Sequence, residues 1–237
     1  RTAPGLPVGS FYGYEVNGIY QTEEEIANTP STPGAVPGDL NFADTNGDET
    51  VDANDRTKIG SPIPDFSFGA NITAEYGGFD LSATLSGKTG YQIFNAKKRL
   101  RFGVENFEES TLDRWTGPGT SNSEPRVTNF GRNYLPSEYL LEDGDHLKIR
   151  NVQLGYSLPS SLTSTAGMNN VRVYVNVTNL YTFDGYSGYT PEIAGIDRAE
   201  GSTTTQGSQN INVLDAGIDR GVYPTSRTLT VGLDLTF

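Results

Sequence analysis

Cysteine is absent from the 237 residues, and histidine, methionine and tryptophan occur once each. Without cysteine the chain can form neither a disulfide framework nor a thiolate metal site. Any Ser-His-Asp triad would have to include His146, which stands at the start of a predicted strand. The sequence also has no G-x-S-x-G, no phosphate-binding glycine loop and no H-E-x-x-H motif. We therefore expect that the chain is not an enzyme and carries no organic cofactor.

Basic residues are scarce. The chain has 17 Lys and Arg against 29 Asp and Glu, which gives a formal net charge of −12. This balance argues against nucleic-acid binding, because a binder needs basic side chains to displace counterions from phosphates. No run of about 18 apolar residues occurs, so we expect no transmembrane helix. A membrane β-barrel is still allowed, because its strands need apolar residues only at alternate positions.

Alternation of apolar and polar residues predicts five β-strands. They cover residues 65–76, 79–87, 146–158, 171–178 and 228–237, with a bulge between Ile149 and Val152 and a sixth candidate at 10–20. Helical periodicity is poor, and residues 23–26 offer a single turn at most. Strands of about 10 to 12 residues exceed the usual 5 to 6 of globular sheets and match tilted membrane strands. A soluble β-sandwich also alternates in this way.

The lengths of the connections favour the membrane alternative. Gly77-Gly78 and residues 159–170 are short, whereas residues 88–145 and 182–226 are long. Antiparallel strands then place the short turns at one end and the long loops at the other, as in outer-membrane barrels with periplasmic turns and long extracellular loops. The same parity predicts a periplasmic carboxyl terminus. Leu233, Leu235 and Phe237 resemble the C-terminal signal for assembly of bacterial outer-membrane proteins.

The number of strands is too small for a closed barrel. A single-chain barrel needs about eight strands or more, and an open sheet edge cannot face lipid because its backbone groups lack partners. We therefore expect residues 1–237 to be the C-terminal segment of a larger barrel. The chain also begins without an initiator Met or a secretory signal, as a mature chain or a piece of a longer one would.

Residues 44–55 are spaced like the calcium loop of an EF-hand, without flanking helices. Calcium prefers six to eight oxygen ligands, which such a loop wraps around the ion. Glu49 departs from the pattern where Gly is usual, and the alternative is an acidic turn held by Asx hydrogen bonds. We expect a structural Ca²⁺ on the extracellular side. Its predicted ligands are Asp44, Asn46, Asp48, Thr50 (through its carbonyl), Asp52 and Asp55.

Three aromatic residues in the long loops are candidates for substrate contact. Trp115 stands in one loop, and Tyr186 and Tyr189 stand at the start of the next. Exposed rings on loops can stack on sugars or hold peptides. The alternative is that they pack the loops together or belong to an interfacial aromatic girdle.

Several stretches, in one consistent order, resemble SusC/RagA-type TonB-dependent outer-membrane transporters of Bacteroidota. They are residues 8–20, Pro37-Gly-Asp-Leu40, 44–60, 64–69, 76–81, Arg114-Trp115, Pro125-Arg126, 147–156, 177–180 and 223–237. The resemblance implies the last portion of a 22-stranded barrel whose N-terminal plug lies outside this chain. It also implies import of oligosaccharides or peptides, energised through TonB, with a SusD-like surface lipoprotein as lid. The partners would be the rest of the transporter, that lipoprotein, TonB and outer-membrane lipid.

A second function class stays open on sequence alone. A soluble, calcium-stabilised β-sandwich could serve as a glycan-binding or adhesin module. A secreted glycan hydrolase would need two carboxylates about 5 to 10 Å apart, and the sequence nominates no such pair.

Overall fold

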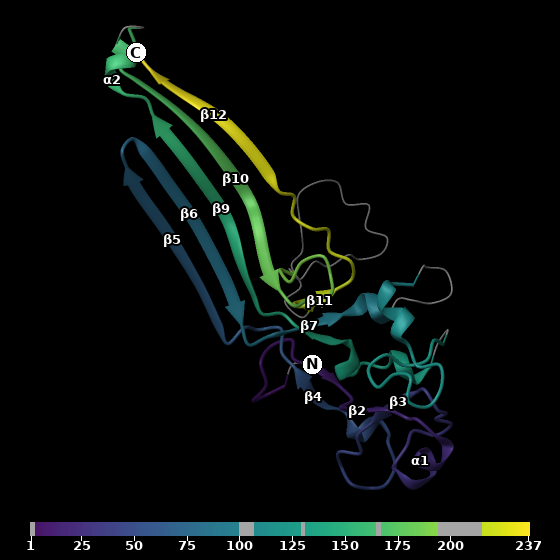
Figure 1. Cartoon of the computed structure of the whole chain (residues 1–237). Helices are drawn as coiled ribbons and strands as arrows, with labels where there is room; N and C mark the ends of the chain where they lie inside the picture. The colour runs from purple at the N-terminus through teal and green to yellow at the C-terminus, as the bar shows by residue number, and fades with distance from the viewer. Residues whose placement is uncertain (1–2, 100–106, 129–130, 165–166, 194–214) are drawn as a thin grey trace, which may run out of the picture. The chain divides into compact units, whose positions relative to one another are not determined.

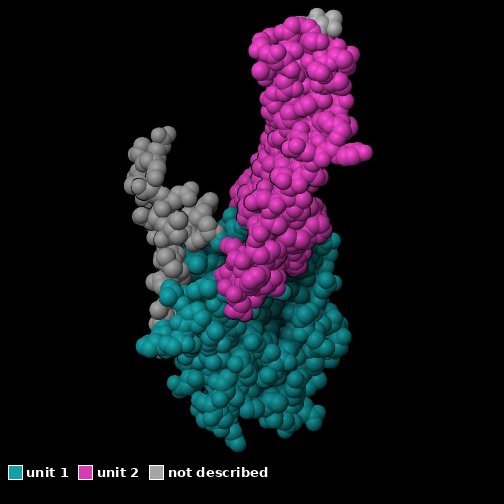
Figure 2. All heavy atoms as spheres, turned by 90° about the vertical axis from the view of Figure 1, so that its left-hand side faces the viewer, with its two compact units in different colours: residues 1–63, 92–143, 192–222 teal, residues 64–91, 144–191, 223–237 magenta. Residues whose placement is uncertain are grey.

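The computed structural model describes residues 3–99, 107–128, 131–164, 167–193 and 215–237. The chain divides into two compact units, which Figure 2 shows in different colours. The sheet unit comprises residues 64–91, 144–191 and 223–237, and the loop unit comprises residues 1–63, 92–143 and 192–222. The long connections predicted from the sequence thus supply most of the loop unit.

Five long antiparallel strands form the sheet unit, and they lie side by side in Figure 1. They are β5 (Phe66–Tyr76), β6 (Phe79–Thr89), β9 (His146–Ser157), β10 (Asn170–Asp184) and β12 (Thr228–Thr236). Their order is β5-β6-β9-β10-β12, so each strand pairs with its predicted neighbour. Among the described residues β5 and β12 are paired on one side only, so the sheet is open. The predicted all-β, antiparallel fold class is confirmed.

The two faces of this sheet differ in polarity. The pairing sets Val173 opposite both Leu233 and Tyr156, and it sets Arg172 opposite Asp234. The apolar face remains open, with side chains that are 37% to 89% exposed. Within the described part of the sheet unit no second sheet covers this face, so the β-sandwich alternative is wrong for these strands. The exposed residues of the apolar face are Phe66, Phe68, Ile72, Tyr76, Phe79, Leu81, Leu154, Val173, Val175, Tyr181, Phe183, Leu229, Val231, Leu233 and Leu235.

The β5–β6 turn has the geometry that its glycines predict. Gly77 and Gly78 both have positive φ, 58° and 88°, as a type I′ hairpin turn requires. The turn thereby matches the right-handed twist of the strands it joins, and the predicted primed hairpin is confirmed.

A pair of bulges shifts the register near the other end of the sheet. Arg150 is skipped where the pairing of β6 passes from Asn151 to Ile149, which confirms the predicted bulge in β9. Facing it, β10 skips two residues between Thr178 and Tyr181, and Asn179 there has a φ of 53°. Asparagine tolerates this left-handed conformation better than most residues. Because β10 skips an even number of residues, its apolar residues Val177 and Tyr181 stay on the same face, and β10 continues to Asp184 beyond its predicted end at residue 178.

Short strands organise the loop unit. Three small sheets pair β1 with β4, pair β2 with β3, and place β7 between β8 and β11. The prediction of a sixth long strand at residues 10–20 is wrong, because this segment is divided between β1 and β2. Gly13 ends β1 where a Cβ atom would lie only 2.2 Å from the carbonyl oxygen of Pro136. The strands are β1 (Phe11–Gly13), β2 (Val16–Ile19), β3 (Leu40–Phe42), β4 (Thr57–Gly60), β7 (Gln92–Asn95), β8 (Leu141–Asp143) and β11 (Ile218–Asp219).

Helices are short throughout the described residues. α1 (Glu23–Asn28) is slightly longer than predicted, and the Thr22 hydroxyl caps it by accepting a hydrogen bond from the Glu25 amide. None of the described helices is long and apolar enough to cross a membrane. The others are η1 (Ala53–Asp55), η2 (Ala96–Arg99), η3 (Glu109–Asp113), η4 (Arg132–Tyr134), η5 (Glu138–Leu140) and α2 (Ser160–Thr163).

Two hydrophobic clusters stabilise the loop unit from within. In the first, the rings of Tyr14 and Phe42 stack with centroids 4.8 Å apart. This cluster contains Tyr14, Ile19, Leu40, Phe42 and Val51, and the second contains Phe11, Phe94, Ala96 and Leu140. The loop unit therefore buries apolar residues of its own, whereas the apolar face of the sheet unit needs an external partner.

Candidate functional site

The apolar face carries aromatic residues at both ends. Tyr76 and Phe79 flank the hairpin turn, and Phe66, Tyr181 and Phe183 lie at the opposite end of the same face. Ten residues of strand span about 33 Å, or roughly 23 Å across a bilayer when tilted by about 45°. That spacing matches the apolar band of membrane barrels, which is about 25 Å tall between two aromatic girdles. The face therefore has the dimensions of a lipid-contacting surface.

The predicted assembly signal lies on the last strand and its end. Leu233 and Leu235 belong to the apolar face, opposite Val173 and Val171, and Phe237 is 80% exposed. These side chains are accessible at an unpaired strand edge. Their recognition by an assembly machinery stays a prediction.

An ion cluster on the polar face joins three strands. Arg172 of β10 reaches across β9 to Asp80 of β6, with 2.9 Å from Nε to Oδ1 and 2.6 Å from Nη2 to Oδ2. Its Nη1 donates to Oδ2 of Asp234 on β12 at 2.9 Å. Gly155 of β9 lies beneath, where a Cβ atom would be 2.4 Å from Asp80 Oδ1 and 2.5 Å from Arg172 Nη2. The missing side chain of Gly155 is thus what allows the bidentate pair to form.

We predict that Gly155→Ala destabilises the complete protein by about 1–3 kcal/mol, because the methyl group must displace the Arg172–Asp80 pair. The measurement is the unfolding temperature in detergent. Gly69→Ala is the matched control, since its added Cβ would meet its nearest neighbour at an ordinary 3.5 Å. In an Arg172→Ala background the cost of Gly155→Ala should largely disappear. An equal cost in both backgrounds would contradict this role.

The acidic loop at residues 44–55 is closed by its own backbone amides. Asp44 accepts from the amides of Gly47 at 2.7 Å and Glu49 at 2.8 Å, and Asp48 accepts from the amide of Thr50 at 3.0 Å. Glu49 has a φ of 66°, so it adopts the turn for which calcium loops normally use Gly. At this position the backbone therefore has the conformation that a calcium loop needs, even though the residue departs from the pattern.

Asp55 holds the two ends of this loop together. It is fully buried, and its carboxylate accepts from the amides of Thr45 at 2.9 Å, Asn46 at 3.3 Å and Asp52 at 2.7 Å. Burial alone would raise the pKa of Asp55. The three amide hydrogen bonds, together with a side-chain hydrogen bond to Asp44, outweigh burial and lower the pKa. Folding is therefore favoured by the ionised carboxylate.

Within the described residues, no three His, Cys, Asp or Glu side chains are grouped closely enough to hold a metal ion. The predicted ligands Asp44, Asp48 and Asp55 instead accept hydrogen bonds from the loop, as the Asx-turn alternative expects. The predicted ligands are oxygen atoms, as calcium prefers, but in this conformation they are not arranged around a common point. Calcium binding stays a prediction.

We predict that Asp55→Asn lowers the free energy of unfolding of this loop by about 2–4 kcal/mol at neutral pH, because it weakens several charge-assisted hydrogen bonds. Since the folded pKa is lowered, the wild-type stabilisation is present above the unfolded pKa of about 3.9 and fades as pH falls below it. The variant should lack that pH dependence. Hydrogen exchange at Thr45, Asn46 and Asp52 measures both effects. Asp48→Asn is the control. Equal protection from hydrogen exchange in the two variants would show that the Asp55 carboxylate does not hold this loop closed.

The three aromatic candidates differ in accessibility. Trp115 is half-buried against the first hydrophobic cluster, and its indole N–H donates to Gln21 Oε1 at 3.0 Å. Tyr186 is only 6% exposed, whereas Tyr189 is 68% exposed. Trp115 and Tyr186 thus pack the loops, as the alternative interpretation proposed, and Tyr189 alone of the three presents an open ring. Substrate contact stays a prediction.

A buried carboxylate that the sequence reasoning missed joins three loop segments. Asp39 is 2% exposed and pairs with Arg126 Nε at 2.7 Å and Arg132 Nη1 at 3.1 Å. Asn133 Nδ2 donates to the same carboxylate at 3.2 Å. The preceding Gly38 has a φ of 89° and leaves no room for a Cβ beside Trp115. The Pro-Gly-Asp stretch was a visible signal for a tight turn, but partners about 90 residues away were not visible.

Tyr91 and His146 form a second unpredicted contact, within the sheet unit. The Tyr91 hydroxyl donates to the Pro191 carbonyl at 3.0 Å and lies 3.0 Å from His146 Nδ1, which also lies 3.0 Å from the Gly144 carbonyl. A proton on Nδ1 would let it donate to this carbonyl, because a carbonyl only accepts. The single histidine therefore ties segments beside the long connections together.

The sheet, with one lipid-type face, one polar face and two open edges, defines the wall of a transmembrane β-barrel. No family model matches the chain. It is 34% identical over 235 residues to TonB-dependent receptor P3 of Formosa agariphila, covering 98% of this chain and 22% of that protein. It is 25% identical to TonB-dependent receptor SusC of Bacteroides thetaiotaomicron, covering 95% of this chain and 20% of SusC.

A solved structure, described as the RagAB peptide transporter, shares the fold. Its TM-score is 0.68 at 22% identity, and the match covers 96% of this chain and 23% of that one. The chain is a portion of a TonB-dependent receptor of the SusC/RagA type, as its sequence predicted. It spans about a fifth to a quarter of the length of these relatives.

Proposed function

We propose that this chain supplies part of the barrel wall and of the extracellular loops of an outer-membrane importer. The observation that carries the proposal is the open sheet, whose apolar face is exposed while its polar face holds an ion cluster. In a barrel the apolar face would contact lipid and the polar face would line the lumen. The similarity to TonB-dependent receptors supports this assignment.

The two open edges require partner strands. The unpaired backbone groups of β5 and β12 would be too costly in lipid, so strands from the rest of the transporter must pair with them. The alternation of short and long connections supports a periplasmic end at the β5–β6 hairpin and the carboxyl terminus. The loop unit then belongs to the extracellular side.

We further propose that the complete transporter imports oligosaccharides or peptides with energy delivered through TonB, and that a SusD-like lipoprotein closes it. SusC and a protein described as a peptide transporter are both among the similar proteins, which supports a nutrient importer. This chain would then act by binding and guiding cargo rather than by catalysis.

We predict that Val175→Arg, near the middle of the apolar face, costs about 2–4 kcal/mol in lipid and sharply lowers the amount of folded transporter in the outer membrane. Asn176→Arg, one residue along on the polar face, should assemble normally. Heat-modifiable migration and substrate uptake measure both variants, and uptake should stop when TonB is deleted. Equal assembly of both variants, or extraction of the protein without detergent, would contradict the proposal.

Calcium binding by residues 44–55 is a separate proposal, based on the oxygen-rich spacing and the calcium-loop path of the backbone at Glu49. Excess chelator should then speed hydrogen exchange of residues 44–55 in the complete transporter, and added Ca²⁺ should restore protection. Asp48→Asn should abolish the response while leaving the Asp55 hydrogen bonds intact. Identical hydrogen exchange with and without chelator would contradict calcium binding, and the amide hydrogen bonds alone would then account for the closed loop.

A further inference from the structure

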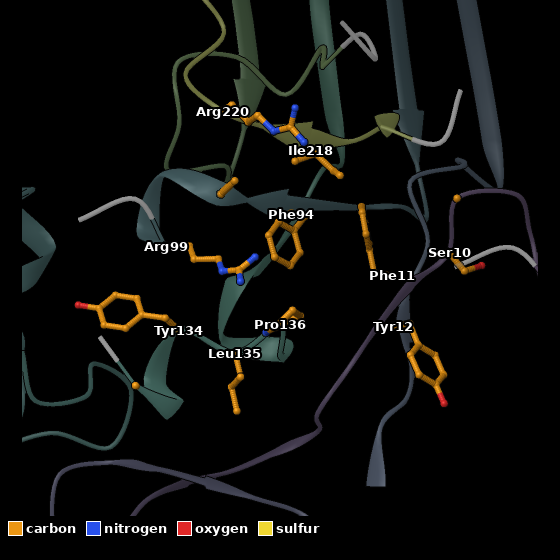
Figure 3. A pocket seen from close by; sticks show the side chains of 13 residues that line it. Ser10, Phe11, Tyr12, Phe94, Arg99, Tyr134, Leu135, Pro136, Ile218 and Arg220 are labelled. Atoms are coloured by element: carbon orange, nitrogen blue, oxygen red, sulfur yellow. The ribbon is translucent and has the colours of Figure 1, made fainter. Parts of the chain in front are cut away.

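A cavity of about 640 Å³ lies within the loop unit, and its size falls in the range of small-ligand sites. Figure 3 shows Arg99 and Arg220 reaching it from two different segments, and Phe94 is part of the same lining. Phe11, Leu135, Pro136 and Ile218 are apolar residues of the same lining. The cavity thus combines an apolar wall with two cations.

The charge of this cavity opposes that of the unit around it. By sequence the loop unit contains 12 Lys and Arg against 23 Asp and Glu. None of the described residues that line the cavity is acidic. Arg220 Nη2 lies 3.8 Å from Asp215 Oδ1, which is an ion-pair distance longer than a hydrogen bond. Two guanidinium groups at an apolar wall are suited to bind a carboxylate, which each can hold with paired hydrogen bonds.

The lining favours an apolar group over a sugar. Phe11 and Phe94 are only 7% and 8% exposed, so they offer little open ring surface on which a sugar could stack. Ser10 Oγ donates to the Pro7 carbonyl, and the Tyr134 hydroxyl donates to the Thr128 carbonyl. The hydroxyl hydrogens of Ser10 and Tyr134 are thus already donated within the protein, whereas a hydrophobic side chain would meet apolar atoms.

We propose that this cavity binds the carboxyl end of a short peptide with an apolar last residue. The carboxylate pairs with Arg99 and Arg220, and the apolar side chain packs against Phe94, Leu135 and Ile218. This inference rests on the proposed importer function, because it assigns peptide rather than neutral glycan as the ligand of the loop unit.

The test is calorimetric titration of the complete, detergent-purified transporter with N-acetyl-leucyl-phenylalanine and with its C-terminal amide. The acid should bind at least about tenfold more tightly than the amide, because the amide loses the charge-assisted hydrogen bonds. Arg99→Gln and Arg220→Gln should each weaken binding of the acid by about tenfold. Lys58→Gln is the matched control, because it removes one exposed cation outside the cavity. The affinity of this variant for the acid should stay within about twofold of the wild-type value. Unfolding temperatures confirm that each variant is folded.

Several results would overturn the proposal. They are no binding of the acid at millimolar concentration, equal binding of acid and amide, or unchanged affinity in both arginine variants. Displacement of the acid by maltohexaose, with loss of maltohexaose binding in Arg99→Gln, would make this a glycan site instead. If TonB-dependent uptake persists while the titration fails, the cavity assignment is wrong and the importer function stands. If the protein is not in the outer membrane, the importer function itself fails.

Discussion

The structure depends on a sheet that cannot bury its own apolar face or satisfy its own edges. Five strands expose valine, leucine and aromatic side chains on one face, and they leave hydrogen-bonding groups unpaired along β5 and β12. In lipid each unpaired backbone group costs several kcal/mol, so the sheet is stable only when further strands continue it. This requirement explains why the five described strands form an extensive sheet whose apolar side chains stay exposed.

Polar groups stabilise the two units in different ways. On the sheet, glycines leave space for large side chains from neighbouring strands: Gly155 lies beneath Arg172, and Gly232 lies beneath the ring of Tyr174. In the loop unit, where regular structure is sparse, buried aspartates accept hydrogen bonds from several segments at once. Asp39 and Asp55 serve in this way and are at most 2% exposed, and Asp219, 1% exposed, accepts from the amides of Gly221 and Val222 in its own turn. Part of the negative charge of the chain is therefore buried and stabilises the fold.

The long strands were predictable because a period of two is a local property of the sequence. The bulge near Arg150 was predictable for the same reason, since it breaks that period. The compensating bulge at Asn179 was missed, because its role appears only when β9 and β10 are set side by side. The segment at residues 10–20 alternates like a strand, but close contact with Pro136 divides it into two short ones.

The sequence by itself determined the strands, their alternating faces, the short and long connections and the family. Each of these is written in neighbouring residues or in contiguous stretches. Only the tertiary structure decided how the loops are held together. It showed the ion pairs of buried Asp39, the amide hydrogen bonds to Asp55, the packing of Trp115 on the first hydrophobic cluster, and the cavity beside Arg99 and Arg220. Except for Asp55, whose amide donors lie within ten residues, these features join side chains many tens of residues apart. Their energies depend on burial and distance, which no local pattern encodes.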